Sequence, residues 1–263
     1  ASGGHSRVVC LGRPWAPLHW IDLVVTTPQY RLPEVENVVM LGLPLNLPPR
    51  ASEGVLAHWR HELESLPRPM LGVLLGGDSG SYRFDAECAN DLGESANRIV
   101  SDRGGSVVVV GSPRTPQKAI ELLTRGLEIP ARAYAWTREA PNPYASVLQL
   151  ADALLVTGDS ASMLAEACHS DKPVGMFDLR ERTRARLNRK LRALTARPAS
   201  AAAGLAARGL WVPARDMTEL HRRVAASGRL TDIAELLAQT ARTGKYDDEL
   251  VRVRQRVIAL LDQ

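Results

Sequence analysis

Between residues 70 and 177, short runs of apolar residues alternate with segments of helical pattern. The apolar runs lack the polar alternation of a half-buried strand, which indicates strands covered on both faces, as in a parallel sheet. Alternating strands and helices favour a doubly wound α/β domain of the Rossmann-like kind. The expected strands are 70–75, 106–110, 131–136, 153–157 and 174–177. The expected helices are 84–100, 116–125, 144–151 and 160–170, with further helix in 231–261.

The first 69 residues follow a different pattern. Strand-like runs occur at 7–11, 22–26 and 38–41, with no helix of useful length between them. Parallel strands need crossovers of about a dozen residues or more, usually helical. We therefore expect residues 1–45 to be the remnant of an N-terminal α/β domain whose earlier part is absent. Residues 46–69 are expected to be a proline-flanked linker with a short helix around 53–66, and residues 70–263 a single C-terminal domain.

Composition excludes several classes of protein. The chain is 45% hydrophobic and 24% charged, which is ordinary for a globular protein and unlike a disordered one. The three cysteines, Cys10, Cys88 and Cys168, are too far apart for a zinc motif or a disulfide framework, which favours a reducing, cytoplasmic setting. No apolar run approaches the length of a membrane-spanning helix, and no signal peptide is recognisable at the start.

Positive charge is concentrated between Arg180 and Arg192. This stretch holds seven basic residues and one acid, a charge of +6, so with a total of +4 the rest of the chain carries −2. A solvated helix face is one explanation. A surface for an anionic membrane or a phosphorylated substrate is the other. Nucleic acid is not expected as a partner, because no aromatic residues are interleaved with the basic ones.

Three of the predicted strands end in residues that suit a phosphorylated ligand. In open α/β sheets, ligands bind at the carboxyl ends of the strands. The first end is glycine-rich, and glycines let backbone N–H groups approach a phosphate. The other two offer hydroxyl groups, with one arginine and a helix N-terminus. The candidate residues are Gly76, Gly77 and Ser79 after the first strand, Ser112, Arg114 and Thr115 after the second, and Asp159, Ser160 and Ser162 after the fourth. Each set is also compatible with an ordinary tight turn or helix cap.

Residues 151–174, reading ADALLVTGDSASMLAEACHSDKPV, resemble the donor-site segment of GT-B glycosyltransferases. They resemble more closely the mitochondrial-fission "elongated mitochondria" family and its bacterial relatives, whose pattern is A-D-A-x-x-V-T-x-D-S-x-S-M-x-x-E-A followed by G-K-P-V. Asp171 stands where that family usually has glycine. Supporting matches are the segment 22–29, Gly76-Gly77 with residues 82–84, Arg114-Thr115-Pro116, and Asn142-Pro143-Tyr144. Ser112-Pro113 replaces part of a family T-S-R-R-T-P motif, with the loss of one arginine.

The resemblance implies a GT-B-like fold in which the C-terminal domain holds a nucleotide diphosphate sugar and the N-terminal domain presents the acceptor. It places the nine candidate residues near the phosphates and Glu166 on the ribose. The leading interpretation is therefore a glycosyltransferase that needs no metal, since no Asp-x-Asp motif is present, and no cofactor beyond its sugar donor. The catalytic base is not identifiable; His5 and His19 are candidates by residue type only.

Two alternatives stay open at this stage. A nucleotide-sugar 2-epimerase would share the fold but would need acid and base carboxylates facing the sugar. A non-catalytic scaffold would use the Arg180–Arg192 stretch at a membrane, as a cytoplasmic, peripheral protein. Serine hydrolysis is disfavoured, because the segment around Ser160 lacks the G-x-S-x-G elbow.

Overall fold

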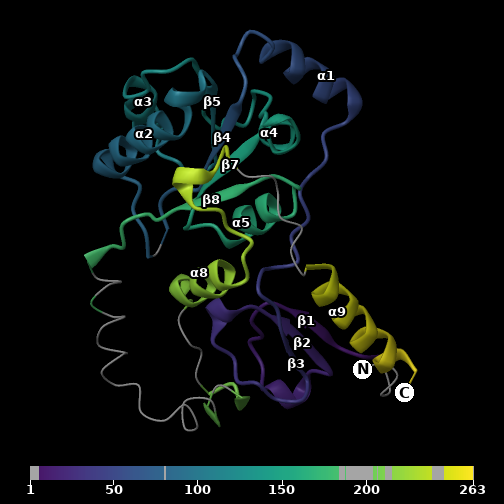
Figure 1. Cartoon of the computed structure of the whole chain (residues 1–263). Helices are drawn as coiled ribbons and strands as arrows, with labels where there is room; N and C mark the ends of the chain where they lie inside the picture. Colours follow the sequence, from purple (N-terminus) through teal and green to yellow (C-terminus); the bar gives the residue numbers. More distant parts are fainter. Residues whose placement is uncertain are drawn as a thin grey trace. The chain divides into compact units, whose positions relative to one another are not determined.

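Figure 1 shows the computed structural model of the chain, which describes residues 6–79, 81–183, 187, 204–205, 207–210, 215–238 and 246–262. The chain forms two compact units. Unit 1 comprises Ala1–Pro44, Leu191–Ser227 and Gly244–Gln263, and unit 2 comprises Leu45–Lys190 and Gly228–Thr243. Within the described parts, no helix combines the length and the apolar character needed to cross a bilayer.

Unit 2 is built on a five-stranded parallel sheet with strand order β6-β5-β4-β7-β8. The strands are β4 (Met70–Leu75), β5 (Ser106–Gly111), β6 (Ala131–Tyr134), β7 (Ala153–Thr157) and β8 (Val174–Phe177). Strands β4, β5 and β7 are buried along their whole length, as continuous apolar runs predict for a sheet covered on both faces. The predicted α/β class and doubly wound parallel sheet are confirmed.

Helices cover both faces of this sheet. They are α1 (Glu53–Glu62), α2 (Ala86–Val100), α3 (Gln117–Arg125), α4 (Tyr144–Leu150) and α5 (Ala161–Cys168), followed by the short turn η4 (Ile233–Glu235). Figure 1 shows α2 and α3 on one side of the sheet and α4 and α5 on the other. Asp85 caps α2, since its carboxylate accepts the N–H of Cys88 at 3.1 Å. Gly72 on β4 lets α4 approach closely, because a Cβ there would lie 2.8 Å from the side chain of Val147.

Unit 1 contains a three-stranded parallel sheet, β1 (Val9–Leu11), β2 (Leu23–Thr26) and β3 (Val38–Met40), in the order β1-β2-β3. Its connections contain only the 3₁₀ turns η1 (Leu18–Trp20) and η2 (Pro28–Tyr30). The strands are therefore parallel without helical crossovers. The sequence pattern indicated the lack of helices between them but not their parallel pairing.

Two later helices complete unit 1: α8 (Met217–Ala226) and α9 (Tyr246–Leu261). Glu249 of α9 accepts the N–H of Gly42 at 3.0 Å, and Arg252 donates to the carbonyl of Met40 at 2.7 Å. Residue 216, just before α8, donates its N–H to the carbonyl of Gln29 at 2.8 Å.

These units differ from the domain boundaries expected from the sequence. Segments of the supposed C-terminal domain at 191–227 and 244–263 belong to unit 1, because α8 and α9 bond to the loops that follow β2 and β3. The supposed linker 46–69 belongs to unit 2, where Trp59 of α1 packs edge to face on Tyr134 with 5.0 Å between ring centroids. The helix expected over 231–261 is replaced in the described residues by η4 and α9.

Candidate functional site

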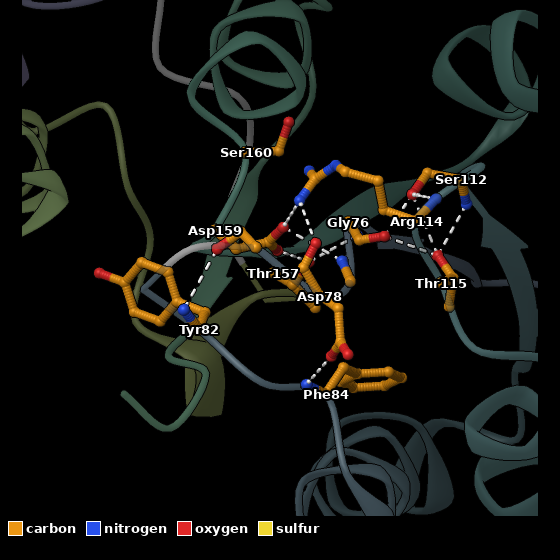
Figure 2. Close-up of polar contacts among 12 residues, drawn as sticks. Gly76, Asp78, Tyr82, Phe84, Ser112, Arg114, Thr115, Thr157, Asp159 and Ser160 are labelled. Carbon is orange, nitrogen blue, oxygen red and sulfur yellow. Dashed lines mark hydrogen bonds and ion pairs between the residues drawn. The ribbon is translucent and has the colours of Figure 1, made fainter. Parts of the chain in front are cut away.

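The candidate site of unit 2 lies where the strand order reverses. The chain runs from β4 outward to β5 and β6, then returns to the other side of β4 to form β7 and β8. The carboxyl ends of β4 and β7 therefore flank a topological switch point, the usual ligand site of such sheets. The loops after β4, β5 and β7 touch one another there: Gly76 donates its N–H to Thr157 Oγ1 at 2.8 Å, and Asp78 donates its N–H to the carbonyl of Arg114 at 3.1 Å. The structure thus brings the three predicted junctions together (Figure 2).

The two glycines after β4 are required by close packing. A Cβ on Gly76 would lie 2.2 Å from Oδ1 of Asp159, and a Cβ on Gly77 would lie 2.2 Å from the carbonyl oxygen of Arg114. Gly77 also has a φ of +129°, a backbone conformation that residues with a side chain rarely adopt. The glycine pair thus allows the loops after β5 and β7 to close onto the end of β4.

The hydroxyls of Ser112 and Thr115 point toward the backbone of the β4 loop. Thr115 Oγ1 donates to the carbonyl of Gly76 at 2.7 Å and accepts the N–H of Ser112 at 2.8 Å, while the hydroxyl of Ser112 also bonds to the carbonyl of Gly76. These groups fasten the β5 loop to the β4 loop. They hold the backbone of the candidate site in place.

Asp159 is a fully enclosed charged group at the switch point, with a side chain that is 0% exposed. Its carboxylate accepts from Thr157 Oγ1 at 2.8 Å and from the N–H of Gly77 at 3.1 Å, and it pairs with Arg114 Nη1 at 2.9 Å. Burial raises its pKa above the ordinary value, while the bonds from Thr157 and Arg114 oppose that shift. Figure 2 shows Arg114 reaching over Asp159 from the β5 side.

The loop between β4 and α2 is held by Asp78 and Arg182. Asp78 accepts the N–H of Phe84 at 2.9 Å, and Arg182 pairs with Asp78 at 3.4 Å while donating to the carbonyl of Ser79 at 3.1 Å. The predicted residue Ser79 contributes its hydroxyl to the same loop, as acceptor for the N–H of Tyr82 at 3.1 Å. Asp78, Arg182 and Thr157 were not among the candidate site residues from sequence. Thr157 lies within the family pattern, which could have selected it, whereas Arg182 lies in a basic stretch, Arg180-Glu181-Arg182-Thr183-Arg184, that gives no signal of a contact with Asp78.

Helix α5 begins at the carboxyl end of β7 with Ser160 as its N-cap residue. Ser160 is half-buried and Ser162 exposed, and their hydroxyl oxygens lie 3.3 Å apart. The free N–H groups and the helix dipole make this end of the helix electropositive.

Glu166 lies further along α5 and is paired with Tyr144 of α4. The Tyr144 hydroxyl donates to Glu166 Oε2 at 2.6 Å. Burial raises the pKa of Glu166, and the hydrogen bond from Tyr144 opposes that rise. For Tyr144, burial and the same hydrogen bond both raise the pKa. Tyr144 lies in the Asn142-Pro143-Tyr144 element, which was noted in the sequence without a role.

Other sequence candidates belong to unit 1 or lie outside the described residues. His19 belongs to unit 1, where it lines a pocket of about 760 Å³ with Asp22, Glu36 and Arg256 among others. His5 and most of the Arg180–Arg192 stretch lie outside the described residues. Across the described segments, no group of three or more His, Cys, Asp or Glu residues is placed to hold a metal ion.

Fold and site together define an α/β protein with a candidate ligand site at the switch point of a doubly wound parallel sheet. The chain belongs to the family described as Mitochondrial fission ELM1, whose model matches residues 1–239. The family resemblance drawn from the segment around Ser160–Glu166 is therefore confirmed.

Two relatives illustrate the match. "Mitochondrial fission protein ELM1" of Arabidopsis thaliana is 34% identical over 116 residues, which cover 44% of this chain and 27% of that protein. "Uncharacterized protein RP120" of Rickettsia prowazekii (strain Madrid E) is 28% identical over 107 residues, which cover 40% of this chain and 30% of that protein. The matched segments span less than a third of each relative's length.

Solved structures of glycosyltransferases resemble the chain with lower sequence identity and low TM-scores. ADP-heptose LPS heptosyltransferase II of E. coli is 17% identical with a TM-score of 0.39, covering 65% of this chain and 61% of that one. WaaG, a glycosyltransferase involved in lipopolysaccharide biosynthesis, is 14% identical with a TM-score of 0.38, covering 90% of this chain and 77% of that one. Likeness at this level carries no conclusion about chemistry.

Proposed function

We propose that the chain is the donor-binding part of a GT-B-type glycosyltransferase and takes a nucleotide diphosphate sugar at the switch point of unit 2. The observation that carries this proposal is the meeting of three loops at one sheet edge, with the Arg114 guanidinium and the start of α5 beside the buried Asp159 (Figure 2). A site of this kind offers a cation, backbone N–H groups and hydroxyls to an anion.

The proposal divides the predicted residues into two groups. Ser160, Ser162 and Arg114 would contact the diphosphate directly, because their polar atoms are at least partly exposed. The others would hold the loops that surround it: Gly76, Gly77, Ser79, Ser112, Thr115 and Asp159. Glu166 would accept hydrogen bonds from ribose hydroxyls through the oxygen that Tyr144 leaves free.

The chemistry asked of these residues is stabilisation of the departing diphosphate. Fixed N–H and guanidinium donors aimed at developing negative charge contribute about 3–4 kcal/mol each in comparable sites. The base that activates the acceptor is not assigned to any residue of this chain. The proposal includes a cytoplasmic location for the protein, at the periphery of the membrane.

A thermal-shift panel of nucleosides, nucleoside diphosphates and nucleotide sugars tests this function. At a ligand concentration about 100 times Kd, linkage adds about 2.7 kcal/mol, or roughly 5–10 °C in Tm for a chain of this size. We expect a uridine-type diphosphate to raise the Tm of the parent and of the control Glu94→Ala, an exposed glutamate on α2, but not that of Glu166→Ala. Turnover of a lone nucleotide sugar without an acceptor would instead favour the epimerase.

A non-catalytic scaffold is the second candidate, favoured by the +6 charge of the Arg180–Arg192 stretch and by the fission name of the plant relative. Two of those arginines are already paired, Arg180 with Glu87 and Asp91 and Arg182 with Asp78, which weakens their attraction to an anionic surface. Binding to anionic vesicles that disappears at high salt, combined with no nucleotide effect on Tm, would support the scaffold and reject the transferase.

A further inference from the structure

The carboxylate of Asp159 occupies a site with the donors of an anion-binding pocket. It accepts from one backbone N–H, that of Gly77, from one hydroxyl, that of Thr157, and it pairs with one guanidinium, that of Arg114. Donor sets of this composition bind phosphate and sulfate ions in many proteins. In this chain the anion that fills the pocket is a side chain of the protein itself.

The packing around Asp159 leaves no room for a second anion at the same donors. Its two carboxylate oxygens lie 2.2 and 2.3 Å from the position that a Cβ of Gly76 would take, so the group packs directly on the backbone that follows β4. A phosphoryl group bonded to the N–H of Gly77 would also lie against a buried carboxylate. Like charges at that distance strongly oppose each other in a site shielded from water.

Arg114 is held with part of its guanidinium directed away from this pocket. The contacts to Asp159 and to the carbonyl of Asp78 both use Nη1, at 2.9 and 3.2 Å. Within the part of the chain that the structure describes, Nε and Nη2 make no hydrogen bond, and the side chain is 41% exposed. The N–H groups on that side are those that a ligand could reach.

We infer that Asp159 is an internal anion that positions Arg114, so that a phosphoryl group binds to the outward side of the guanidinium and not to the N–H of Gly77. Asp159 is thus a positioning residue and makes no contact with the ligand. The part of this inference that concerns ligand orientation rests on the proposed function, whereas the filled pocket does not.

Anion rescue tests the filled pocket without any nucleotide. Asp159→Ala empties the pocket and should lower Tm, and 20 mM phosphate or formate should restore at least a third of the loss at pH 8. Asp159→Asn should show no rescue, because the amide still fills the space. The matched control is Asp152→Ala. Asp152 also accepts a backbone N–H, that of Met70 at 2.6 Å, and an arginine donor, Arg68 at 2.8 Å, but its side chain is 43% exposed. Equal responses of the two alanine variants to the anions would overturn the inference.

A double-mutant cycle decides the matter if Asp159→Ala does not fold. Arg114→Met should lower the Tm of the parent by several degrees and that of Asp159→Asn by less than half as much, because the pair is already broken there. Equal losses in both backgrounds would show that Asp159 does not hold Arg114.

Nucleotide binding tests the orientation of the ligand. We expect Asp159→Asn to weaken UDP binding at least tenfold and to leave uridine binding unchanged, since only the diphosphate uses Arg114. Equal weakening of UDP and uridine, or no weakening of either, would overturn the positioning role. If the parent binds neither ligand, the proposed function fails, and the anion rescue still decides whether Asp159 fills the pocket.

Discussion

At the scale of single residues, Gly76 and Gly54 differ in what an added methyl group would meet. At Gly76 it would lie 2.2 Å from the carboxylate of Asp159, whereas at Gly54 on α1 nothing lies within 4 Å. We expect Gly76→Ala to cost about 2–3 kcal/mol of unfolding free energy through overpacking. Gly54→Ala should raise the free energy of unfolding by about 0.5–1 kcal/mol, because alanine has the higher helix propensity. Urea denaturation of the two variants measures both changes in unfolding free energy, and similar values for them would contradict the close approach of Asp159 to Gly76.

A second residue-scale prediction concerns Asp171, where the family pattern has glycine. Its φ is +56°, in the left-handed region that costs a non-glycine residue about 1 kcal/mol. We expect Asp171→Gly to raise stability by about 0.5 kcal/mol, because glycine relieves that cost but makes the unfolded chain freer. Asp102→Gly, at an exposed aspartate within the 3₁₀ turn η3 (Ser101–Arg103), should lower stability instead. A loss of stability in Asp171→Gly would count against the assigned backbone conformation.

At the scale of elements, the sequence predicts the strands of unit 2 well because their apolar runs are continuous and end in glycine or polar residues. The strands at 70–75, 153–157 and 174–177 have the expected bounds, and α5 begins one residue after its expected start, at Ala161. The parallel pairing of the strands in unit 1 could not be predicted, because the sequence offers no helices for the crossovers that such strands usually need. The association of α9 with this unit is not evident from local sequence either, since it involves long-range bonds such as that from the N–H of Gly42 to Glu249.

The direction of side chains in the loops was the least predictable feature of the site. A hydroxyl after a parallel strand suits a phosphate or a neighbouring carbonyl equally well, and Thr115 bonds to the carbonyl of Gly76. Likewise nothing in the sequence distinguishes an exposed Asp159 from one buried under Arg114. The location of the candidate site follows from local sequence, whereas the contacts of each residue depend on which strands become neighbours.

The bond between Tyr144 and Glu166 joins α4 to α5 and predicts a pH-dependent effect. Burial holds the pKa of Glu166 above its ordinary value of 4.5, so the protonated form favours folding, and this contribution is lost as the pH rises through the raised pKa. Tyr144→Phe removes a donor to the carboxylate and raises that pKa further. We expect Tyr144→Phe to lower the free energy of unfolding by about 1 kcal/mol at pH 8 and by clearly less at pH 4.5. The value at pH 8 allows for the partial exposure of Glu166, which weakens the bond. Urea titrations at both pH values measure the difference, which should vanish when Glu166→Gln is the background.

At the scale of the whole molecule, unit 1 is assembled from three separate stretches of the chain, and unit 2 from two. The sheet of unit 1 is therefore in contact with a helix, α9, that begins about two hundred residues after it. Val253 of α9 is 8% exposed, and its neighbours Glu249 and Arg252 bond to the backbone after and within β3. No pattern in the first 45 residues could indicate that their sheet contacts this distant helix.

If these contacts stabilise the sheet of unit 1, Val253→Asp should cause a selective loss of stability. Burying an unpaired carboxylate costs about 3 kcal/mol or more, and each domain-like unit has a core of its own, so the loss should be confined to unit 1. Hydrogen exchange followed by mass spectrometry should show faster exchange in peptides that cover β2, with β5 of unit 2 unchanged. Val251→Asp provides the control on the same helix, because Val251 is 51% exposed and its substitution should change exchange in neither sheet. Equally faster exchange in β2 and β5 after Val253→Asp would mean that the two units unfold together and that α9 stabilises both of them.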